Sequence, residues 1–317
     1  MNEAPHAPLA VADLRDAIAT RAVRRPRDPV IPFEFGVFDS QGEPADFARL
    51  RREWPSNKTV NPTGSIGPVE DSRTGTFVYG GILIGQYGHF LLESLARAWL
   101  WRSQAADGVV FHCERPELRP WQADALRMCG LDTADIVFVT RCTLFERLLV
   151  PQPGYVISTL FHPDHRDALA FEPWMPVPGR KLWISRSRLG KEALGTFTNE
   201  VALETLLGER GWTIVHPQIL SFAEQIRLFA SAEVIGGIEG SALHSIVHVG
   251  NFGGALRIVP RTPAGRLNSR NYGLIARVKG LRQQVFGGRI EQVSGEGASG
   301  RLAIDDIDDC ARFLDQA

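Results

Sequence analysis

The chain has 317 residues, of which 44% are hydrophobic and 22% are charged, and its 35 basic residues nearly balance 36 acidic ones. This composition is ordinary for a folded protein and argues against a disordered, collagen-like or repetitive chain. A formal net charge of −1 lacks the basic excess of general nucleic-acid and membrane-surface binders, so neither class is favoured. The length predicts about two domains.

The sequence shows no membrane-spanning stretch, secretion signal or disulfide framework. No run approaches the roughly 18 apolar residues that cross a bilayer, and the early acidic residues do not fit a signal peptide. Because the cysteines form no CxxC pair, we expect four reduced, buried thiols, Cys113, Cys129, Cys142 and Cys310. We therefore expect a cytoplasmic protein.

The first half of the chain predicts strands and helices in alternation, which is typical of an α/β layer. An amphipathic helix is expected at 9–22, and a basic, proline-broken linker follows it to about residue 30. The strands expected after the linker are 76–84, 108–113, 135–140 and 144–150, and the expected helices are 87–101 and 120–129.

The second half predicts a parallel sheet covered by helices. It follows a proline-rich segment, 151–180, that we interpret as the connection between two domains. Right-handed crossovers would bring all the loops that follow the strands to one edge, where open α/β sheets bind ligands. The expected strands are 181–185, 212–215, 233–235 and 255–259. The expected helices are 199–207, capped by Thr198, 221–230, with a Ser221–Glu224 capping box, and 240–249.

The first group of residues that could carry chemistry lies in the segment 85–99. His89, Glu93 and Arg97 are spaced four residues apart, so they would form a line on one helix face. A carboxylate one turn from an imidazole can orient the ring as a general base, and Gly88 would let a ligand approach the backbone. The alternative is an amphipathic helix with a solvated polar stripe.

The second group, ISRSRLGK at 184–191, follows a predicted strand. It combines Arg186, Arg188 and Lys191 with two serine hydroxyls, and such groups suit phosphate oxygens. In a chain without net positive charge, a basic cluster at the ligand-binding edge is notable. The alternative is a solvated basic loop.

The third group, VIGGIEGSALHS at 234–245, joins a strand that ends in glycines to a helix that begins with small residues. Free backbone amides and the helix dipole at such a start form an anion site, here around Gly237, Gly240 and Ser241. Glu239 could accept hydrogen bonds from ribose or sugar hydroxyls, and His244 lies one turn into the helix. The alternative is a turn that only packs the helix tightly.

Other motifs are absent from the sequence. There is no Walker loop, GxSxG elbow, HExxH motif or DxD pair in a promising loop, so we expect neither a metal nor a cofactor. The acidic run at 305–309 is interpreted as a solvated helix face. Four tryptophans are expected in the core rather than in a sugar-binding platform, Trp99, Trp101, Trp183 and Trp212.

The order of the three groups resembles glycosyltransferase family 61, which includes bacterial capsular polysaccharide biosynthesis proteins. The matching stretches are YGHFLLESLARAW at 87–99, LWISRSRLG at 182–190 and the segment 198–248. Many members have His-Gly-Ala at the late glycine turn, where this chain has Glu-Gly-Ser at 239–241. The residues that match family positions are His89, Glu93, Arg97, Arg186, Arg188, Glu239, Gly240 and His244.

The resemblance implies an α/β, GT-B-like arrangement, in which two Rossmann-like domains face a cleft. Since 317 residues is short for two full domains of this type, the N-terminal one would be reduced. We expect an N-terminal helix and basic linker at 1–30, an acceptor-side domain at 31–165 and a nucleotide-sugar-binding domain at 166–317. The implied reaction moves a sugar from a nucleotide-sugar donor to a saccharide or lipid-linked saccharide acceptor in capsule or other surface polysaccharide biosynthesis, with inversion and without a metal.

On the donor side, we expect Arg186, Arg188 and the Gly240 turn to brace the diphosphate and stabilise the leaving nucleotide. Glu239 would hold ribose or sugar hydroxyls of the donor. Two other functions stay open, namely a different nucleotide-donor transferase such as a sulfotransferase, and a non-catalytic nucleotide-sugar-binding protein.

On the acceptor side, we expect His89, oriented by Glu93, to deprotonate an acceptor hydroxyl, with Gly88 and Arg97 beside it. No nucleic-acid partner is expected. Peripheral association with the inner face of the cell membrane stays open, since capsule assembly occurs there.

Overall fold

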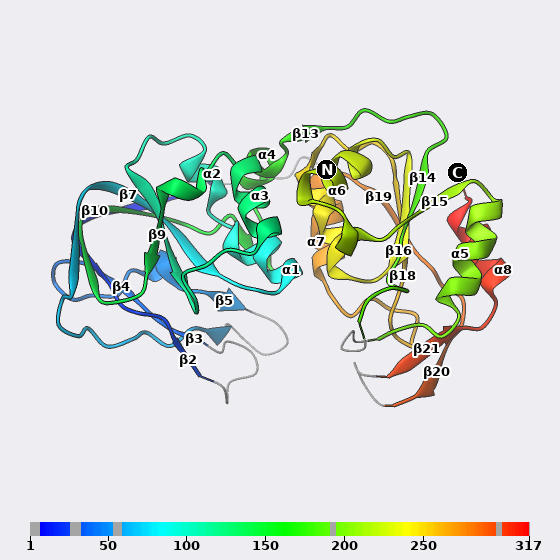
Figure 1. The fold of residues 1–317 in the computed structure, drawn as a ribbon, viewed down its shortest axis with the longest axis horizontal. Helices are drawn as coiled ribbons and strands as arrows, with labels where there is room; N and C mark the ends of the chain where they lie inside the picture. The colour runs from blue at the N-terminus through cyan, green and yellow to red at the C-terminus, as the bar shows by residue number, and fades with distance from the viewer. Residues whose placement is uncertain (1–6, 26–32, 53–58, 191–194, 296–299, 317) are drawn as a thin grey trace. The chain divides into compact units, whose positions relative to one another are not determined.

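The computed structural model describes residues 7–25, 33–52, 59–190, 195–295 and 300–316 (Figure 1). Two parts of the sequence-based expectations, the linker prolines at 26 and 29 and the cluster residue Lys191, lie outside these residues. The chain divides into two units, Met1–Phe171 and Glu172–Ala317. Each unit is built around a sheet of its own.

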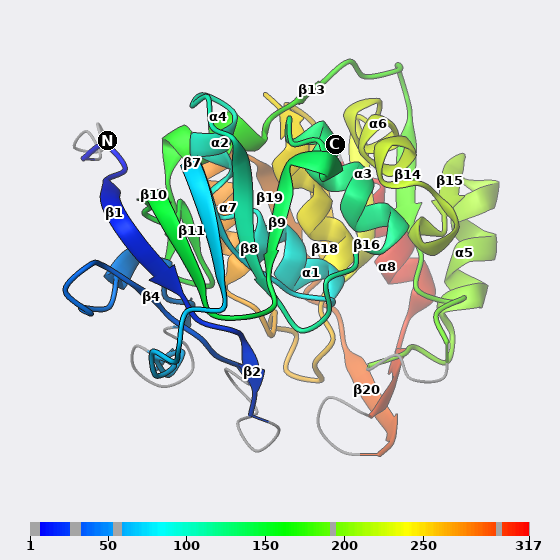
Figure 2. The same ribbon diagram turned by 60° about the vertical axis from the view of Figure 1, so that its left-hand side comes forward.

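The first unit contains a six-stranded mixed sheet (Figure 2). Its strands are β1 (Val11–Ala19), β4 (Val37–Phe38), β7 (Asp71–Leu83), β8 (Gly108–Cys113), β9 (Ile136–Val139) and β10 (Thr143–Pro151). Their order is β4-β1-β10-β7-β8-β9, in which β10, β7, β8 and β9 run parallel and β1 is antiparallel to both neighbours. The chain passes from β7 through β8 to β9 and then returns to the other side of β7, so the strand order reverses between β7 and β10. Open α/β sheets bind ligands at such a reversal.

Short strand pairs and helices complete the first unit. The pairs are β2 (Val23–Arg24) with β3 (Phe33–Glu34), β5 (Arg51–Arg52) with β6 (Thr59–Val60), and β11 (Tyr155–Val156) with β12 (Leu160–Phe161). The α-helices are α1 (Tyr87–His89), α2 (Ala98–Trp101), α3 (Pro120–Met128) and α4 (Pro163–Leu169). The 3-10 helices are η1 (Asp46–Ala48) and η3 (Thr133–Asp135), and η2 (Phe90–Ser94) is a π-helix.

The strands expected at 76–84, 108–113, 135–140 and 144–150 and the helix at 120–129 are confirmed, with β7 beginning earlier than expected. The helix expected at 9–22 is wrong, because its residues form β1. Two buried alanines, Ala17 and Ala19, lie on one face of this strand, and Asp13 binds Arg147 of β10 across the pair, at 2.7 and 2.9 Å. Pairing with β10 therefore overrides the local helix propensity of the Ala, Leu and Arg residues.

The single helix expected at 87–101 is interrupted. Helix α1 passes into the π-helix η2, where the Leu95 amide donates to the Phe90 carbonyl at 3.2 Å, and helix α2 begins only at Ala98. Arg97 has non-helical torsions, φ −115° and ψ 9°. The wider π-helical turn and this break move Arg97 away from the face that carries His89 and Glu93. The predicted alignment therefore holds for His89 and Glu93 but not for Arg97.

The second unit contains a five-stranded parallel sheet. Its strands are β14 (Lys181–Ile184), β15 (Trp212–Val215), β16 (Val234–Ile238), β18 (Ala255–Val259) and β19 (Arg282–Val285). They follow the order β15-β14-β16-β18-β19, and every neighbouring pair is parallel. The chain moves from β14 to β15 on one side and then crosses to β16 on the other. The strand order therefore reverses between β14 and β16.

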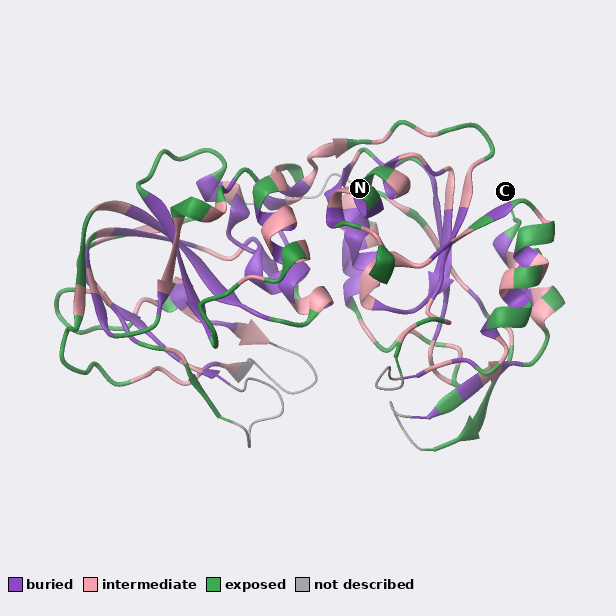
Figure 3. Ribbon diagram, viewed as in Figure 1, coloured by how far each residue is buried: buried purple, intermediate pink, exposed green. Residues whose placement is uncertain are grey.

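Helices cover both faces of this sheet (Figure 1). On one face, α5 (Glu200–Glu209) and α8 (Ile307–Leu314) pack on Trp183 and Trp212 in one buried cluster. The other face carries α6 (Phe222–Ala230), α7 (Asn271–Lys279) and the 3-10 helix η5 (Ser241–His248). Figure 3 shows the strands β14, β16 and β18 mostly buried and the outward side of α5 exposed. The remaining elements are β13 (Glu172–Pro173) paired with β17 (Val249–Gly250), the hairpin of β20 (Ile290–Ser294) and β21 (Arg301–Ile304), and η4 (Pro217–Ile219).

The structure confirms the strands at 181–185, 212–215 and 255–259 and the Ser221–Glu224 capping box of α6. Three details differ. The strand expected at 233–235 continues to Ile238, and the helix expected at 240–249 is a 3-10 helix. Thr198 does not cap α5, because the helix begins after Asn199, and the Asn199 side chain instead binds the backbone of Ile304 at 2.7 and 3.1 Å.

The proline-rich segment at 151–180 is not an irregular linker, because it contains the regular elements β11, β12, α4 and β13. The four cysteines are free and buried, as expected. Three of the four tryptophans are buried, and the half-buried Trp99 donates from Nε1 to the Gln152 carbonyl at 2.9 Å. In the described part of the chain, no helix combines the length and apolarity needed to span a membrane.

Candidate functional site

His89 lies directly after the carboxyl end of β7, where the strand order of the first unit reverses. The Gln86 side chain accepts a hydrogen bond from the His89 amide at 2.7 Å and caps the start of α1. The Ser94 hydroxyl donates to the Ile82 carbonyl at 2.7 Å and accepts from the Ile84 amide at 3.0 Å. These bonds fasten the helical segment to the end of β7 and fix the place of the imidazole.

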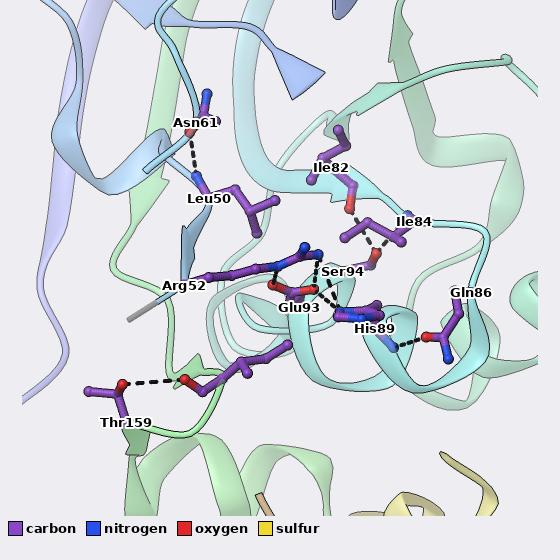
Figure 4. Close-up of polar contacts among 11 residues, drawn as sticks. Leu50, Arg52, Asn61, Ile82, Ile84, Gln86, His89, Glu93, Ser94 and Thr159 are labelled. Carbon is purple, nitrogen blue, oxygen red and sulfur yellow. Dashed lines mark hydrogen bonds and ion pairs between the residues drawn. The ribbon is translucent and has the colours of Figure 1, made fainter. Parts of the chain in front are cut away.

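The His89 imidazole forms a three-residue cluster with Glu93 and Arg52 (Figure 4). Nδ1 of His89 lies 2.5 Å from Oε2 of Glu93. Arg52, from β5, donates from Nε to Oε1 of Glu93 at 2.7 Å and from Nη2 to Oε2 at 2.8 Å, and its Nη2 also lies 3.2 Å from Nδ1 of His89. The side chain of Glu93 is 2% exposed, that of Arg52 13% and that of His89 37%. The carboxylate is therefore enclosed, and the imidazole remains accessible.

The bonding pattern fixes which ring nitrogen of His89 can react. Burial alone would raise the pKa of the Glu93 carboxyl, but the hydrogen bonds from His89 and Arg52 outweigh burial and hold that pKa below its usual value. An ionised Glu93 only accepts, so Nδ1 of His89 carries the proton of their short bond. Among the described residues Nε2 takes part in no hydrogen bond. The lone pair of Nε2 is therefore available to accept a proton from a ligand.

Arg97 is buried apart from this cluster. No hydrogen bond in the described part of the chain joins it to His89 or Glu93. Its guanidinium donates to backbone oxygens of Pro151 (3.1 Å), Arg49 (3.4 Å) and Phe47. Burial lowers the pKa of Arg97 to about 10. Gly88 is also buried, within α1.

In the second unit, the predicted basic and glycine-rich groups meet where the strand order reverses. Residues 185–188 follow β14, and Glu239 and Gly240 follow β16, the neighbouring strand. The Arg186 guanidinium lies against Gly240, since a Cβ atom on that glycine would stand 2.6 Å from Nη1. Arg188 is exposed and lies nearer β15, where its charge adds to burial in lowering the pKa of His216.

Two carboxylates of α5 shape the 185–188 loop. Glu204 accepts hydrogen bonds from the hydroxyls of Ser185, at 2.5 Å, and Ser187, at 3.1 Å. Glu200 accepts from the Arg186 amide at 2.7 Å. Burial, together with the charge of Glu204, raises the pKa of Glu200 to about 7, although the Arg186 amide and charge oppose the shift. The serine hydroxyls predicted to meet phosphate are thus already bound to Glu204.

Glu239 holds the loop that follows β18. Oε1 accepts from the Ser269 amide at 3.0 Å, and Oε2 accepts at 3.3 Å from both the Arg261 amide and Nδ2 of Asn268. The residue is only 1% exposed. This loop delivers Arg261, whose charge, after burial, is the next cause that lowers the pKa of Arg186. The charge of Arg261 therefore acts on Arg186, while its side chain packs against Gly195, where a Cβ would stand 3.2 Å from Nη1 of Arg261.

The remaining predicted donor-side residues are fixed by packing. The Gly240 amide donates to the Tyr272 hydroxyl, which donates in turn to the Gly240 carbonyl, both at 2.9 Å. His244 is buried with its ring 4.8 Å from that of Tyr272. Gly237 is paired inside the sheet, where a Cβ would come within 3.2 Å of Ile184. Ser241, half-buried, begins η5.

Residues 87–250, more than half of the chain, match the family model for glycosyltransferase 61. The chain belongs to glycosyltransferase family 61. It is therefore a glycosyltransferase, and the sulfotransferase and non-catalytic alternatives are set aside. A comparison with curated proteins found no match.

The match with family 61 contains His89, Glu93 and every predicted donor-side residue, whereas Arg52 and Arg261 fall outside it. Sequence reasoning missed both arginines, since neither lies in a periodic segment or beside a recognisable motif. It also missed the contacts of Glu200 and Glu204 with the 185–188 loop, because both residues lie in the helix expected at 199–207, where Glu200 would only cap the first turn. Among the described residues, no group of three or more His, Cys, Asp or Glu side chains could hold a metal ion.

Proposed function

We propose that this family 61 glycosyltransferase moves a sugar from a nucleotide-sugar donor to a saccharide or lipid-linked saccharide acceptor. The reaction belongs to capsule or other surface polysaccharide biosynthesis, at the cytoplasmic face of the cell membrane. We assign acceptor activation to the first unit and donor binding to the second, as two Rossmann-like domains of a GT-B-type enzyme. The observation that carries the proposal is the short bond from Nδ1 of His89 to the enclosed Glu93 carboxylate, because it leaves Nε2 as a base.

The proposed reaction is a single displacement. Nε2 of His89 takes the proton of an acceptor hydroxyl as that oxygen attacks the anomeric carbon, and the bond from this carbon to the donor phosphate breaks. The new bond forms on the face opposite the leaving group, so the configuration inverts. Glu93 stabilises the imidazolium that forms, as an orienting carboxylate does for other histidine bases.

The leaving diphosphate gains negative charge and needs positive groups. We propose that Arg186, Arg188 and the first amides of η5, beginning at Ser241, supply them in place of a metal. The Arg186–Gly240 contact supports this assignment. Because Glu239 is almost fully buried and already holds the 261–269 loop, we propose that it acts on the donor through that loop.

The test begins with a thermal-shift screen of UDP-, GDP-, CMP- and TDP-sugars, in which a ligand at 100 times its Kd adds about 2.7 kcal/mol of stability. Transfer by His89→Ala is then compared with the parent, using the donor found. We expect the transfer rate to fall by about 10²–10⁴-fold with donor affinity unchanged. An unchanged rate, or an equal loss of donor affinity, would refute the role of His89 as the base.

A further inference from the structure

Arg52 joins the His89–Glu93 pair from a part of the chain outside the family match. Both of its bonds to Glu93 are short, and they engage both carboxylate oxygens, which is the fork geometry that arginine favours with carboxylates. Figure 4 shows its side chain extended from β5 toward Glu93 and His89. Burying the charge of an arginine here costs desolvation free energy, which only a well-placed partner such as Glu93 can offset. The position therefore suggests a role for Arg52 at this pair.

The backbone around Arg52 is held at several points. The Leu50 amide donates to Oδ1 of Asn61 at 2.7 Å, and the Asn61 amide donates to the Leu50 carbonyl at 3.0 Å. Asn61 is itself buried and donates from Nδ2 to the Phe35 carbonyl at 2.9 Å. Arg52 also forms a parallel bridge with Ile157. The guanidinium is therefore delivered from a fixed backbone position.

The guanidinium and the carboxylate have opposite effects on the imidazole. Glu93 stabilises the imidazolium form of His89, whereas a permanent positive charge 3.2 Å from Nδ1 opposes it. Arg52 also uses two donors on Glu93, so the carboxylate is kept ionised and turned toward Nδ1. Glu93 thereby orients the ring, and Arg52 places a positive charge beside it.

We propose that Arg52 is a positioning residue for the base: it orients Glu93 toward Nδ1 of His89, so that Nε2 is left to accept a proton, and its positive charge disfavours a second proton on the ring. This inference rests on the proposed role of His89. In this role Arg52 touches neither donor nor acceptor and acts through Glu93.

Other ionisable groups surround the pair but are engaged elsewhere. Arg51 binds Asp46 at 2.5 and 2.6 Å, and Arg97 binds backbone oxygens. Four further ionisable residues line a small hollow together with Glu93, namely Arg49, Arg51, Arg97 and Tyr155. Two others, Tyr87 and Arg119, lie near the start of α1. Within the described part of the chain, Arg52 is the cation that contacts both Glu93 and His89, so its effect on His89 can be separated from those of the other arginines.

The test uses the full-length protein with 15N-labelled histidine. NMR correlations of the ring nitrogens report the tautomer and the titration of His89, whose signals are identified by their loss in His89→Ala. In the parent, we expect the neutral form of the ring to carry its proton on Nδ1. In Arg52→Gln, the ring should bind its second proton at a pH higher by about one unit, because a nearby positive charge is gone.

Two variants serve as controls. Arg51→Gln removes the neighbouring arginine of the same hairpin, which is bound to Asp46, and should leave the titration of His89 unchanged. Arg52→Lys keeps the charge without the fork and should keep the titration near that of the parent. Retained backbone NMR spectra in each variant exclude a general loss of structure.

Transfer kinetics provide the second readout. The acidic limb of the pH–rate profile of Arg52→Gln should move to higher pH, so that kcat falls by about two- to threefold at pH 7 and is nearly unchanged at pH 9. An unmoved titration in a folded Arg52→Gln, or a neutral parent ring that carries its proton on Nε2, would overturn the inference. Full activity of His89→Ala would instead overturn the proposed function, while the titration would still report whether Arg52 and His89 are coupled.

Discussion

The guanidinium of Arg186 fills the space beside Gly240, because a Cβ on this glycine would stand 2.6 Å from Nη1. The backbone of Gly240 is extended, with φ −174°, so its conformation suits any residue and the requirement for glycine comes from the contact alone. The contact joins the loops that follow β14 and β16, the two strands between which the order of the second sheet reverses. A side chain at position 240 would therefore change the proposed donor site directly.

We expect Gly240→Ala to weaken binding of the donor sugar nucleotide by about tenfold or more, the loss of roughly one charge-assisted hydrogen bond. Stability should change by less than about 1 kcal/mol, because the flexible end of Arg186 can move away. Isothermal titration and urea unfolding measure the two quantities. The matched control is Gly208→Ala in α5, where a Cβ meets open space. It should add about 0.5–1 kcal/mol of stability and leave binding unchanged.

Glu200 should make the second unit less stable as the pH rises. Its pKa is raised from 4.5 to about 7, so the folded state holds the proton more tightly than the unfolded state. The stabilisation is complete below about pH 4.5 and is lost as the pH rises through about 7, at up to about 1.4 kcal/mol per pKa unit. Glu200→Gln stays neutral, so unfolding measured at pH 5 and pH 8 should show a smaller loss than in the parent. Glu209→Gln, exposed at the end of the same helix, should behave like the parent, and equal losses in all three proteins would contradict the prediction.

Tyr79→Phe should destabilise the first unit by about 1–3 kcal/mol. The Tyr79 hydroxyl lies 2.7 Å from Nδ1 of His112, and Nε2 of His112 lies 2.7 Å from the Thr20 carbonyl. The carbonyl only accepts, so Nε2 carries the ring proton and Nδ1 accepts from Tyr79. Burial lowers the pKa of His112 to about 4, and the ring therefore stays neutral and would be left with an unsatisfied nitrogen. Denaturant unfolding at pH 7 measures the loss, and a change below about 0.5 kcal/mol would show that this bond contributes little.

Asn268→Ala separates the two possible actions of Glu239. Asn268 donates to the Glu239 carboxylate from the loop after β18. If Glu239 acts through this loop, the variant should weaken donor binding severalfold in isothermal titration, in the same direction as Glu239→Gln. Direct contact of Glu239 with the donor predicts a loss only in Glu239→Gln. Circular dichroism melting of both variants shows whether the loop bonds also support stability, for which we expect about 1 kcal/mol per bond.

Local patterns predicted what local forces determine. The Ser221–Glu224 capping box and strands such as Trp212–Val215 can be read from a few neighbouring residues, and the His89–Glu93 contact lies within one helical turn. The identity of β1 could not be read in this way, because Asp13 and Arg147, which bind across its pairing with β10, are 134 residues apart. For the same reason Arg52, 37 residues before His89, was not predicted.

The position of β7 between β10 and β8 has a practical consequence for making fragments of this enzyme. The recognisable family stretch starts at residue 87, just after β7 ends. Trimming the gene to that stretch would remove β1 and β7, leave β10 without either neighbour and expose one edge of β8, and such unpaired strands invite self-association. It would also discard Arg52. Cutting after Phe171 instead leaves each sheet whole.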